Sequence, residues 1–162
     1  MDLQLDGTTA VVTGASKGIG LAITEALAAE GAHVIAGARS RTDEISTLES
    51  AGNVTFVPVD LSTPDGPPAL VDAADNRNGI DILINNAGAV TPRPGGFTSV
   101  TDDDWTATLT LTFLSAVRTT RAALPRITRR GGGAVVTVSS VNAFLPDPTI
   151  IDYCAAKAAL TN

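Results

Sequence analysis

The sequence is poor in cysteine, in aromatic residues and in positive charge. Its 162 residues include one cysteine, Cys154, and 4% aromatic residues, and the net charge is −6. A single cysteine excludes an internal disulfide, which fits a reducing compartment, and we expect a cytoplasmic protein. Without a basic cluster, nucleic acid is not an expected partner.

Long apolar runs are also missing. No stretch approaches the roughly 20 apolar residues that a helix needs to cross a bilayer, so we expect no membrane partner. Residues 1–6 contain neither a basic segment nor an apolar run, so no signal peptide is visible. We predict no metal site.

Short β-branched runs alternate with longer segments of helical periodicity. The hydrophobic share of 44% is made mostly of Ala, Val, Leu and Ile, which suits a layered core in one domain, residues 1–162. We expect strands at 8–13, 33–38, 54–60, 80–85 and 134–139, all nearly continuously apolar, as in parallel strands covered on both faces. We expect helices at 19–30, 42–50, 66–76 and 102–128, and a fifth from residue 152. This alternation predicts an α/β fold with a doubly wound, Rossmann-like parallel sheet.

The long fourth helix has a clear start. Thr101 can cap it, and Asp104 completes a capping box. Trp105, Thr112 and Ala116 recur on one face at helical spacing, which predicts core packing for most of that face.

A glycine-rich turn follows the first strand. Its spacing, Gly14-x-x-x-Gly18-x-Gly20, lets the backbone turn tightly, and the N-terminus of the next helix offers N–H groups to a pyrophosphate. Glycine-rich turns between a strand and a helix also occur for structural reasons alone, but the position after the first strand favours a dinucleotide site. The predicted cofactor-binding residues of this turn are Gly14, Ser16, Lys17, Gly18, Ile19 and Gly20.

The end of the second strand bears on the choice of cofactor. A carboxylate there would bind the ribose hydroxyls of NAD, but the sequence has Ala38 followed by Arg39. The fork of N–H donors on the Arg39 guanidinium suits the oxygens of a phosphate, and Lys17 is expected nearby. We therefore predict NADP(H) as the preferred cofactor, with NAD(H) possible; the alternative is that Arg39 is a solvated loop residue.

Tyr153 and Lys157 are four residues apart, so they share one face of the last helix. A phenol with an ordinary pKa near 10 is a poor base at neutral pH, and a shift of about 3 units requires roughly 4 kcal/mol. An ammonium about 5 Å away supplies about 3 kcal/mol at an effective dielectric of 20. The pair therefore predicts an acid/base centre, and Ser140, at the end of the strand before the loop that leads to this helix, can donate to a substrate oxygen.

Five motifs together resemble the short-chain dehydrogenase/reductase family in order and spacing, over essentially the whole chain. They are Thr13-Gly14-x-x-x-Gly18-Ile19-Gly20, Asp60-Leu61, Asn85-Asn86-Ala87-Gly88, Ser140 and Tyr153-x-x-x-Lys157.

The resemblance implies roles for these residues and an arrangement of the sheet. Asp60, with Leu61, would bind the adenine; Asn86, Ala87 and Gly88 would line the cofactor channel; and Lys157, beside Tyr153, would hold the nicotinamide ribose. Ser140 is preferred over Ser139 because its distance from Tyr153 along the chain matches the family. The implied strand order is 3-2-1-4-5 with further strands beyond the fifth, and the implied assembly is a homodimer or homotetramer formed through the long helices.

One position departs from the family pattern. The family carries an Asn on the long helix that anchors a proton-relay water, and Thr112 stands there in this chain. We therefore hold Thr112 as the fourth catalytic position, with a slower relay expected. The leading hypothesis is an oxidoreductase that interconverts a small carbonyl compound and a secondary alcohol. A dinucleotide-binding protein with little catalysis and a purely structural subunit are the alternatives.

The fifth strand leads to one further expectation. It would lie at the open side of the sheet, yet residues 134–139 contain no charge, proline or glycine that would keep another strand from pairing with this edge. We expect that the C-terminal strands of the family are absent from this chain, or that a partner covers the edge.

Overall fold

The computed structural model describes residues 3–77 and 79–162. Positions 1, 2 and 78 of the predicted domain, 1–162, lie outside the described residues. Positions 1 and 2 also belong to the N-terminal segment in which no signal peptide is visible.

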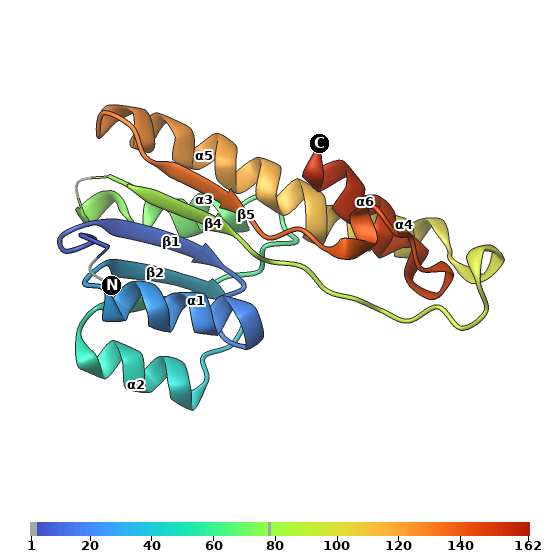
Figure 1. The fold of residues 1–162 in the computed structure, drawn as a ribbon, viewed down its shortest axis with the longest axis horizontal. Helices are drawn as coiled ribbons and strands as arrows, with labels where there is room; N and C mark the ends of the chain where they lie inside the picture. Colours follow the sequence, from blue (N-terminus) through green and yellow to red (C-terminus); the bar gives the residue numbers. More distant parts are fainter. Residues whose placement is uncertain (1–2, 78) are drawn as a thin grey trace.

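Five parallel strands form one sheet: β1 (Thr9–Thr13), β2 (His33–Ala38), β3 (Val54–Pro58), β4 (Ile82–Asn85) and β5 (Ala134–Thr137). Their order is β3-β2-β1-β4-β5, as predicted (Figure 1). Each predicted strand is present, and the expected boundaries are too long by up to two residues at one end or the other.

Helices cover the sheet on both sides because successive residues of each inner strand point to opposite faces. On one face, α1 (Gly18–Ala29) and α2 (Asp43–Ala51) pack over a core that includes Val12, Val34 and Ile84. On the other face, α3 (Gly66–Asp72) and α5 (Ser115–Arg129) cover a core that includes Val11 and Leu83.

The edge strand β5 differs from this pattern. All four of its residues are exposed, so the expectation that it is covered on both faces is wrong, although its place at the edge of the sheet is confirmed. The apolar composition of the strand predicted burial, but β5 has only β4 beside it among the described residues. The apolar sequence therefore predicted the strand but not the exposure of its residues at the edge of the sheet.

The long helix is interrupted in its middle. It consists of α4 (Asp102–Leu109), a π-helical turn (Thr110–Leu114) and α5. The capping box between Thr101 and Asp104 is present as predicted. On the predicted core face Thr112 and Ala116 are buried, whereas Trp105 is half-buried and packs edge-on against Phe97.

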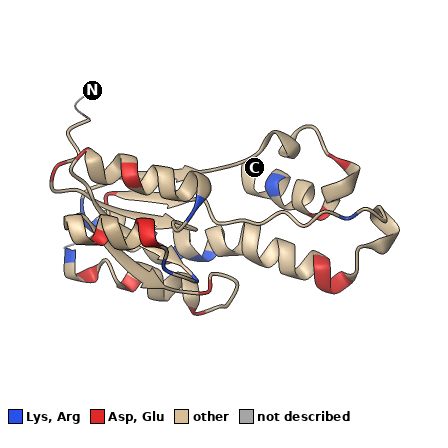
Figure 2. Ribbon diagram, turned by 90° about the horizontal axis from the view of Figure 1, so that it is seen from below, with Lys and Arg blue, Asp and Glu red and all other residues tan. Residues whose placement is uncertain are grey.

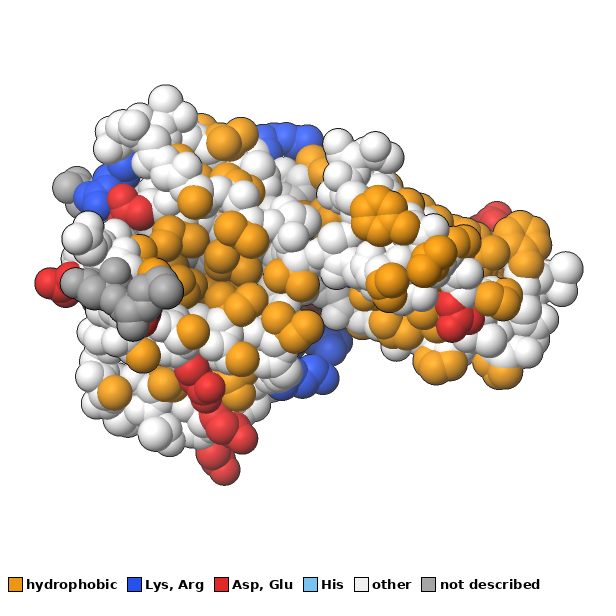
Figure 3. Space-filling model, viewed as in Figure 1, with side chains coloured by type: hydrophobic (Ala, Val, Ile, Leu, Met, Phe, Trp, Pro, Cys, Tyr) orange, Lys and Arg blue, Asp and Glu red, His pale blue; other side chains and the backbone are white. Residues whose placement is uncertain are grey.

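Three segments form an extension beyond the carboxyl ends of β4 and β5. They are the loop of residues 89–100, α4, and α6 (Ile151–Thr161) (Figure 1). Figure 2 shows acidic residues at the start of α4 and both acidic and basic residues elsewhere in the extension. Figure 3 shows many hydrophobic side chains on its surface. Because α6 carries Tyr153 and Lys157, the extension forms one wall of the candidate site.

Candidate active site

The ends of β1 and β4 are tied together by Thr13 and Asn86. The Thr13 hydroxyl accepts from the backbone N–H groups of Asn86 (2.9 Å) and Ala87 (3.0 Å). In return, the Asn86 side-chain amide donates to the carbonyl oxygens of Thr13 (3.0 Å) and Gly14 (3.3 Å). These bonds hold the glycine turn against the segment after β4, where neighbouring strands connect to opposite sides of the sheet. Ligands bind at such a switch point in doubly wound folds.

The glycines of the turn have two different roles. A Cβ on Gly20 would lie 2.2 Å from the carbonyl oxygen of Gly14, so Gly20 permits the close packing of α1 on the turn. Gly18 has a φ of +55°, and a Cβ there would meet nothing within 4 Å. The backbone of Gly18 therefore faces open space at the N-terminus of α1, where N–H groups can receive a phosphate.

Two adjoining clefts run along the carboxyl ends of the strands. One, of about 330 Å³, is lined by residues that include Gly18, Asn86, Tyr153 and Lys157. The other, of about 360 Å³, is lined by residues that include Arg39 and Asp60. Lys17, Gly88 and Ala89 line both, so the two clefts join into one site.

The second cleft contains most of the predicted nucleotide-binding residues. Gly14, Ser16, Lys17, Arg39, Asp60, Leu61, Ala87 and Gly88 line it together with Ser40 and Thr42. Hydrogen bonds from the side chain and the backbone N–H of Ser62, with a smaller contribution from Arg39, lower the pKa of Asp60 below its ordinary value. The cleft therefore presents a carboxylate beside Arg39 and Lys17.

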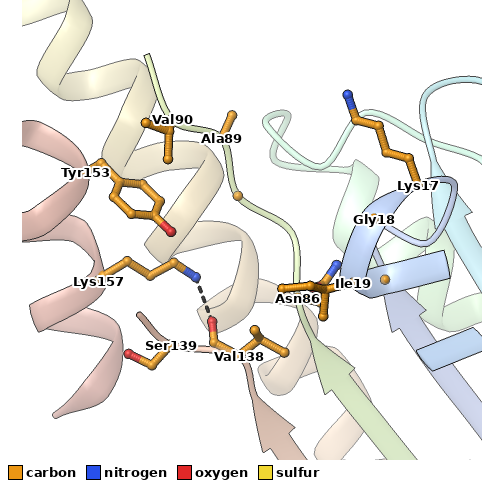
Figure 4. Close-up of a pocket in the computed structure, with 12 residues that line it drawn as sticks. Lys17, Gly18, Ile19, Asn86, Ala89, Val90, Val138, Ser139, Tyr153 and Lys157 are labelled. Atoms are coloured by element: carbon orange, nitrogen blue, oxygen red, sulfur yellow. Dashed lines mark hydrogen bonds between the residues drawn. The ribbon is translucent and has the colours of Figure 1, made fainter. Parts of the chain in front are cut away.

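Tyr153 and Lys157 meet in the first cleft, as the helical spacing predicted (Figure 4). The Lys157 ammonium lies 5.7 Å from the centre of the Tyr153 ring and donates to the carbonyl oxygen of Val138 at 2.6 Å. Lys157 is only 3% exposed, and this burial lowers the pKa of its ammonium. The carbonyl of Val138, directly after β5, holds the lysine beside the tyrosine.

Thr112 lies beside the same lysine. It is fully buried in the π-helical turn, and its hydroxyl has no hydrogen-bond partner among the described residues. A Cβ built on Gly88 would lie 3.6 Å from the Thr112 hydroxyl and 3.8 Å from the Lys157 nitrogen, so both groups face the same side of Gly88. Such π-helical turns often mark functional sites.

Comparisons with known proteins agree with this geometry. The model of the short chain dehydrogenase family matches residues 8–162. The chain belongs to the short-chain dehydrogenase/reductase family.

Three similar proteins illustrate the relationship. An uncharacterized oxidoreductase, YvrD, of Bacillus subtilis is 34% identical over 163 residues, covering 99% of this chain and 61% of YvrD. The structure of L-sorbose reductase from Gluconobacter frateurii, complexed with NADPH and L-sorbose, is 37% identical with a TM-score of 0.91, covering 99% of this chain and 62% of that one. An NADH-dependent reductase, A1-R′, complexed with NAD, is 28% identical with a TM-score of 0.88, covering 99% of this chain and 71% of that one.

This short-chain dehydrogenase/reductase chain spans about three fifths of the length of the curated relatives that it matches. Those relatives are named as oxidoreductases or as dehydrogenase/reductases.

The predicted substrate-binding serine, Ser140, does not line the clefts in this structure. Its hydroxyl caps the short 3₁₀ helix Val141–Ala143, accepting from the backbone N–H of Asn142 and donating to the side chain of Asn142, both at 3.2 Å. Ser139 does line the first cleft, but its hydroxyl bonds that of Thr161 on α6. Neither hydroxyl is hydrogen-bonded to Tyr153 in the described part of the chain, and the role of Ser140 stays a prediction.

Several contributors to the site were not predicted. The role of the Val138 carbonyl could not be predicted from the sequence, because any residue type supplies a backbone oxygen. Val90, 49% exposed, lines the first cleft from the loop of residues 89–100. Arg93 forms an ion pair with the buried carboxylate of Asp152, the residue before Tyr153, and the two partners are 59 residues apart in sequence.

Proposed function

We propose that this chain carries the cofactor-binding and catalytic part of an NADP(H)-dependent oxidoreductase that interconverts a carbonyl compound and a secondary alcohol. The single observation that supports the proposal most is the shared cleft of Tyr153 and Lys157, whose opposite wall is the glycine turn. A nicotinamide dinucleotide, when bound, supplies or accepts the hydride. The chain's own residues would bind that group and move the proton.

Tyr153 is the proposed acid/base. In the reductive direction its hydroxyl would donate a proton to the oxygen of the substrate, and the resulting phenolate would be stabilised by Lys157. Unit charges about 5.7 Å apart, the distance between the lysine nitrogen and the ring centre, interact by about 3 kcal/mol at an effective dielectric of 20. Burial of Lys157 strengthens this interaction because few water molecules screen it.

The remaining proposed roles follow the two clefts. Gly14, Ser16, Gly18, Ile19 and Gly20 would bind the pyrophosphate. Asp60 and Leu61 would contact the adenine, while Asn86, Ala87 and Gly88 would line the channel between the two halves of the cofactor. Ser140 would orient the substrate oxygen, for which its hydroxyl proton must turn from the Asn142 side chain to the substrate.

The preference for NADP(H) is proposed from Arg39 and Lys17, which line the same cleft. Relatives with solved structures bind either cofactor: one is complexed with NADPH and another with NAD. The test is to measure the Kd of NADPH and of NADH by titrating the Trp105 fluorescence or by calorimetry. Tighter binding of NADPH is expected, and a preference for NADH would contradict this part of the proposal.

A dinucleotide-binding protein with little catalysis is the second candidate. It is favoured by Thr112 in place of the family's Asn and by the engagement of the Ser140 hydroxyl with Asn142. Turnover of NADPH with a panel of ketones distinguishes the two candidates. Oxidation of NADPH supports the enzyme, whereas tight binding of NADPH without turnover of any ketone supports the second candidate.

Three further expectations remain proposals. We infer a small carbonyl or alcohol as the substrate, association into a homodimer or homotetramer through the long helices, and a cytoplasmic location. In the described part of the chain, no helix is both long enough and apolar enough to cross a membrane.

A further inference from the structure

Arg93 joins three segments of the extension. Its backbone N–H donates to the carbonyl oxygen of Thr149 at 2.6 Å. Its guanidinium pairs with Asp104 at 2.8 Å and with Asp152 at 2.9 Å. Arg93 therefore connects the loop of residues 89–100 with the start of α4 and the start of α6.

Asp152 is the buried end of this group. It is 1% exposed, and the hydroxyl of Thr108 on α4 donates to the same oxygen that Arg93 contacts, at 2.7 Å. Burial acts to raise the pKa of this carboxyl, but the hydrogen bonds from Arg93 and Thr108 outweigh it and lower that pKa below its ordinary value. A buried carboxylate depends strongly on such partners, because removal of one leaves an uncompensated charge.

The position of this network matters because α6 has little support from the sheet. The helix packs mainly on α4, on the π-helical turn and on the short 3₁₀ helices that precede it. Among the described residues, the ion pairs outside this network join elements in the layers around the sheet, such as Arg126 with Asp75 and Arg130 with Asp81. The network of Arg93 is thus the ionic contact that fixes α6 within the extension.

We propose that Arg93 and Asp152 are positioning residues for Tyr153. Asp152 immediately precedes Tyr153 in the first turn of α6, so a shift of that turn moves the phenol relative to Lys157 and the glycine turn. Neither Arg93 nor Asp152 lines the two clefts, so they act through the helix and not by touching cofactor. This inference rests on the proposed role of Tyr153 as the acid/base.

The experiment compares Arg93→Gln with a matched control, Arg130→Gln. Arg130 also pairs with an aspartate, with two contacts of 2.9 Å to Asp81, but at the opposite end of the strands from the clefts. For Arg93→Gln we expect kcat to fall on the order of 10- to 100-fold, as for a small misplacement of a catalytic group, with little change in the Kd of NADPH. For Arg130→Gln we expect wild-type kcat. Arg93→Lys, which keeps a charge, should restore much of kcat and serves if the glutamine variant does not fold.

A second readout does not depend on turnover. Tyr153 is the only tyrosine, so isotope labelling of tyrosine rings gives one set of nuclear magnetic resonance signals from the site. We expect Arg93→Gln to shift or broaden these signals and Arg130→Gln to leave them in place. Unchanged ring signals in a folded Arg93→Gln variant, or a kcat equal to that of the control, would overturn the inference. If the wild-type chain neither binds NADPH nor reduces any ketone, the proposed function fails, and the ring signals still decide whether Arg93 positions Tyr153.

Discussion

The unpartnered hydroxyl of Thr112 allows a prediction with a matched control on the same long helix. Thr112 and Thr119 are both fully buried. The Thr119 hydroxyl donates to the carbonyl oxygen of Ser115 at 2.7 Å, whereas that of Thr112 has no partner among the described residues. Substitution by valine keeps the shape of the side chain and removes only the hydroxyl, so the two variants should affect stability in opposite directions.

The magnitudes follow from the hydrogen bonds. Thr119→Val loses one neutral hydrogen bond, which costs about 1 kcal/mol, and the Ser115 carbonyl remains within reach of its helical backbone donor. Thr112→Val removes a buried group that has no partner, so the free energy of unfolding should rise by about 1–3 kcal/mol. Because valine and threonine have similar helix propensities, that contribution cancels.

The assay is urea unfolding of the wild type and both variants, followed by circular dichroism. At this chain length each kcal/mol corresponds to a Tm change of about 2–4 °C, so a thermal melt checks the same signs. If Thr112→Val is destabilised as much as Thr119→Val, the Thr112 hydroxyl has a bound partner in solution, such as the relay water, and the reasoning on stability is refuted.

Three other predictions concern the cofactor, the relay and pH. Arg39→Asp should weaken NADPH binding on the order of 10- to 100-fold, as for loss of a charge-assisted phosphate contact, with NADH much less affected; equal weakening of both cofactors would argue against a phosphate contact. Thr112→Asn should raise turnover at neutral pH without changing the Kd of NADPH, and an unchanged rate in a folded variant would mean that the relay does not use this position. Because the pKa of Asp152 is lower in the folded chain than its ordinary value, its ionisation stabilises the fold above about pH 4, and this contribution is lost as the pH falls through the folded value. The stability difference between wild type and Asp152→Asn should therefore shrink on acidification, and a difference that stays constant with pH would contradict the assignment.

The sequence predicted the features that depend on local pattern. The five strands and their order, the capping box at Thr101 and the meeting of Tyr153 with Lys157 all follow from periodicity, spacing or the resemblance, and the structure contains them. Parallel strands place their carboxyl ends at one edge of the sheet, so motifs that follow successive strands converge there. The approach of Asn86 to the glycine turn is a result of that convergence.

Features that depend on contacts between distant segments could not be predicted. The ion pair of Arg93 with Asp152 joins two segments 59 residues apart, and neither residue has a local pattern that indicates the other. The π-helical turn that places Thr112 beside Gly88 interrupts a segment whose periodicity looks like one continuous helix. The Ser140 hydroxyl is oriented because it caps a 3₁₀ helix that no sequence pattern indicated.

The most direct test of the account compares the wild type with Tyr153→Phe in NADPH oxidation with a panel of ketones, alongside the Kd of NADPH for both. Phenylalanine removes only the hydroxyl, so the account predicts that turnover is abolished while the Kd stays nearly unchanged. Lys157→Ala provides the comparison within the same pair and should impair both turnover and cofactor binding. A Tyr153→Phe variant with turnover comparable to the wild type would contradict the claim that Tyr153 is the acid/base.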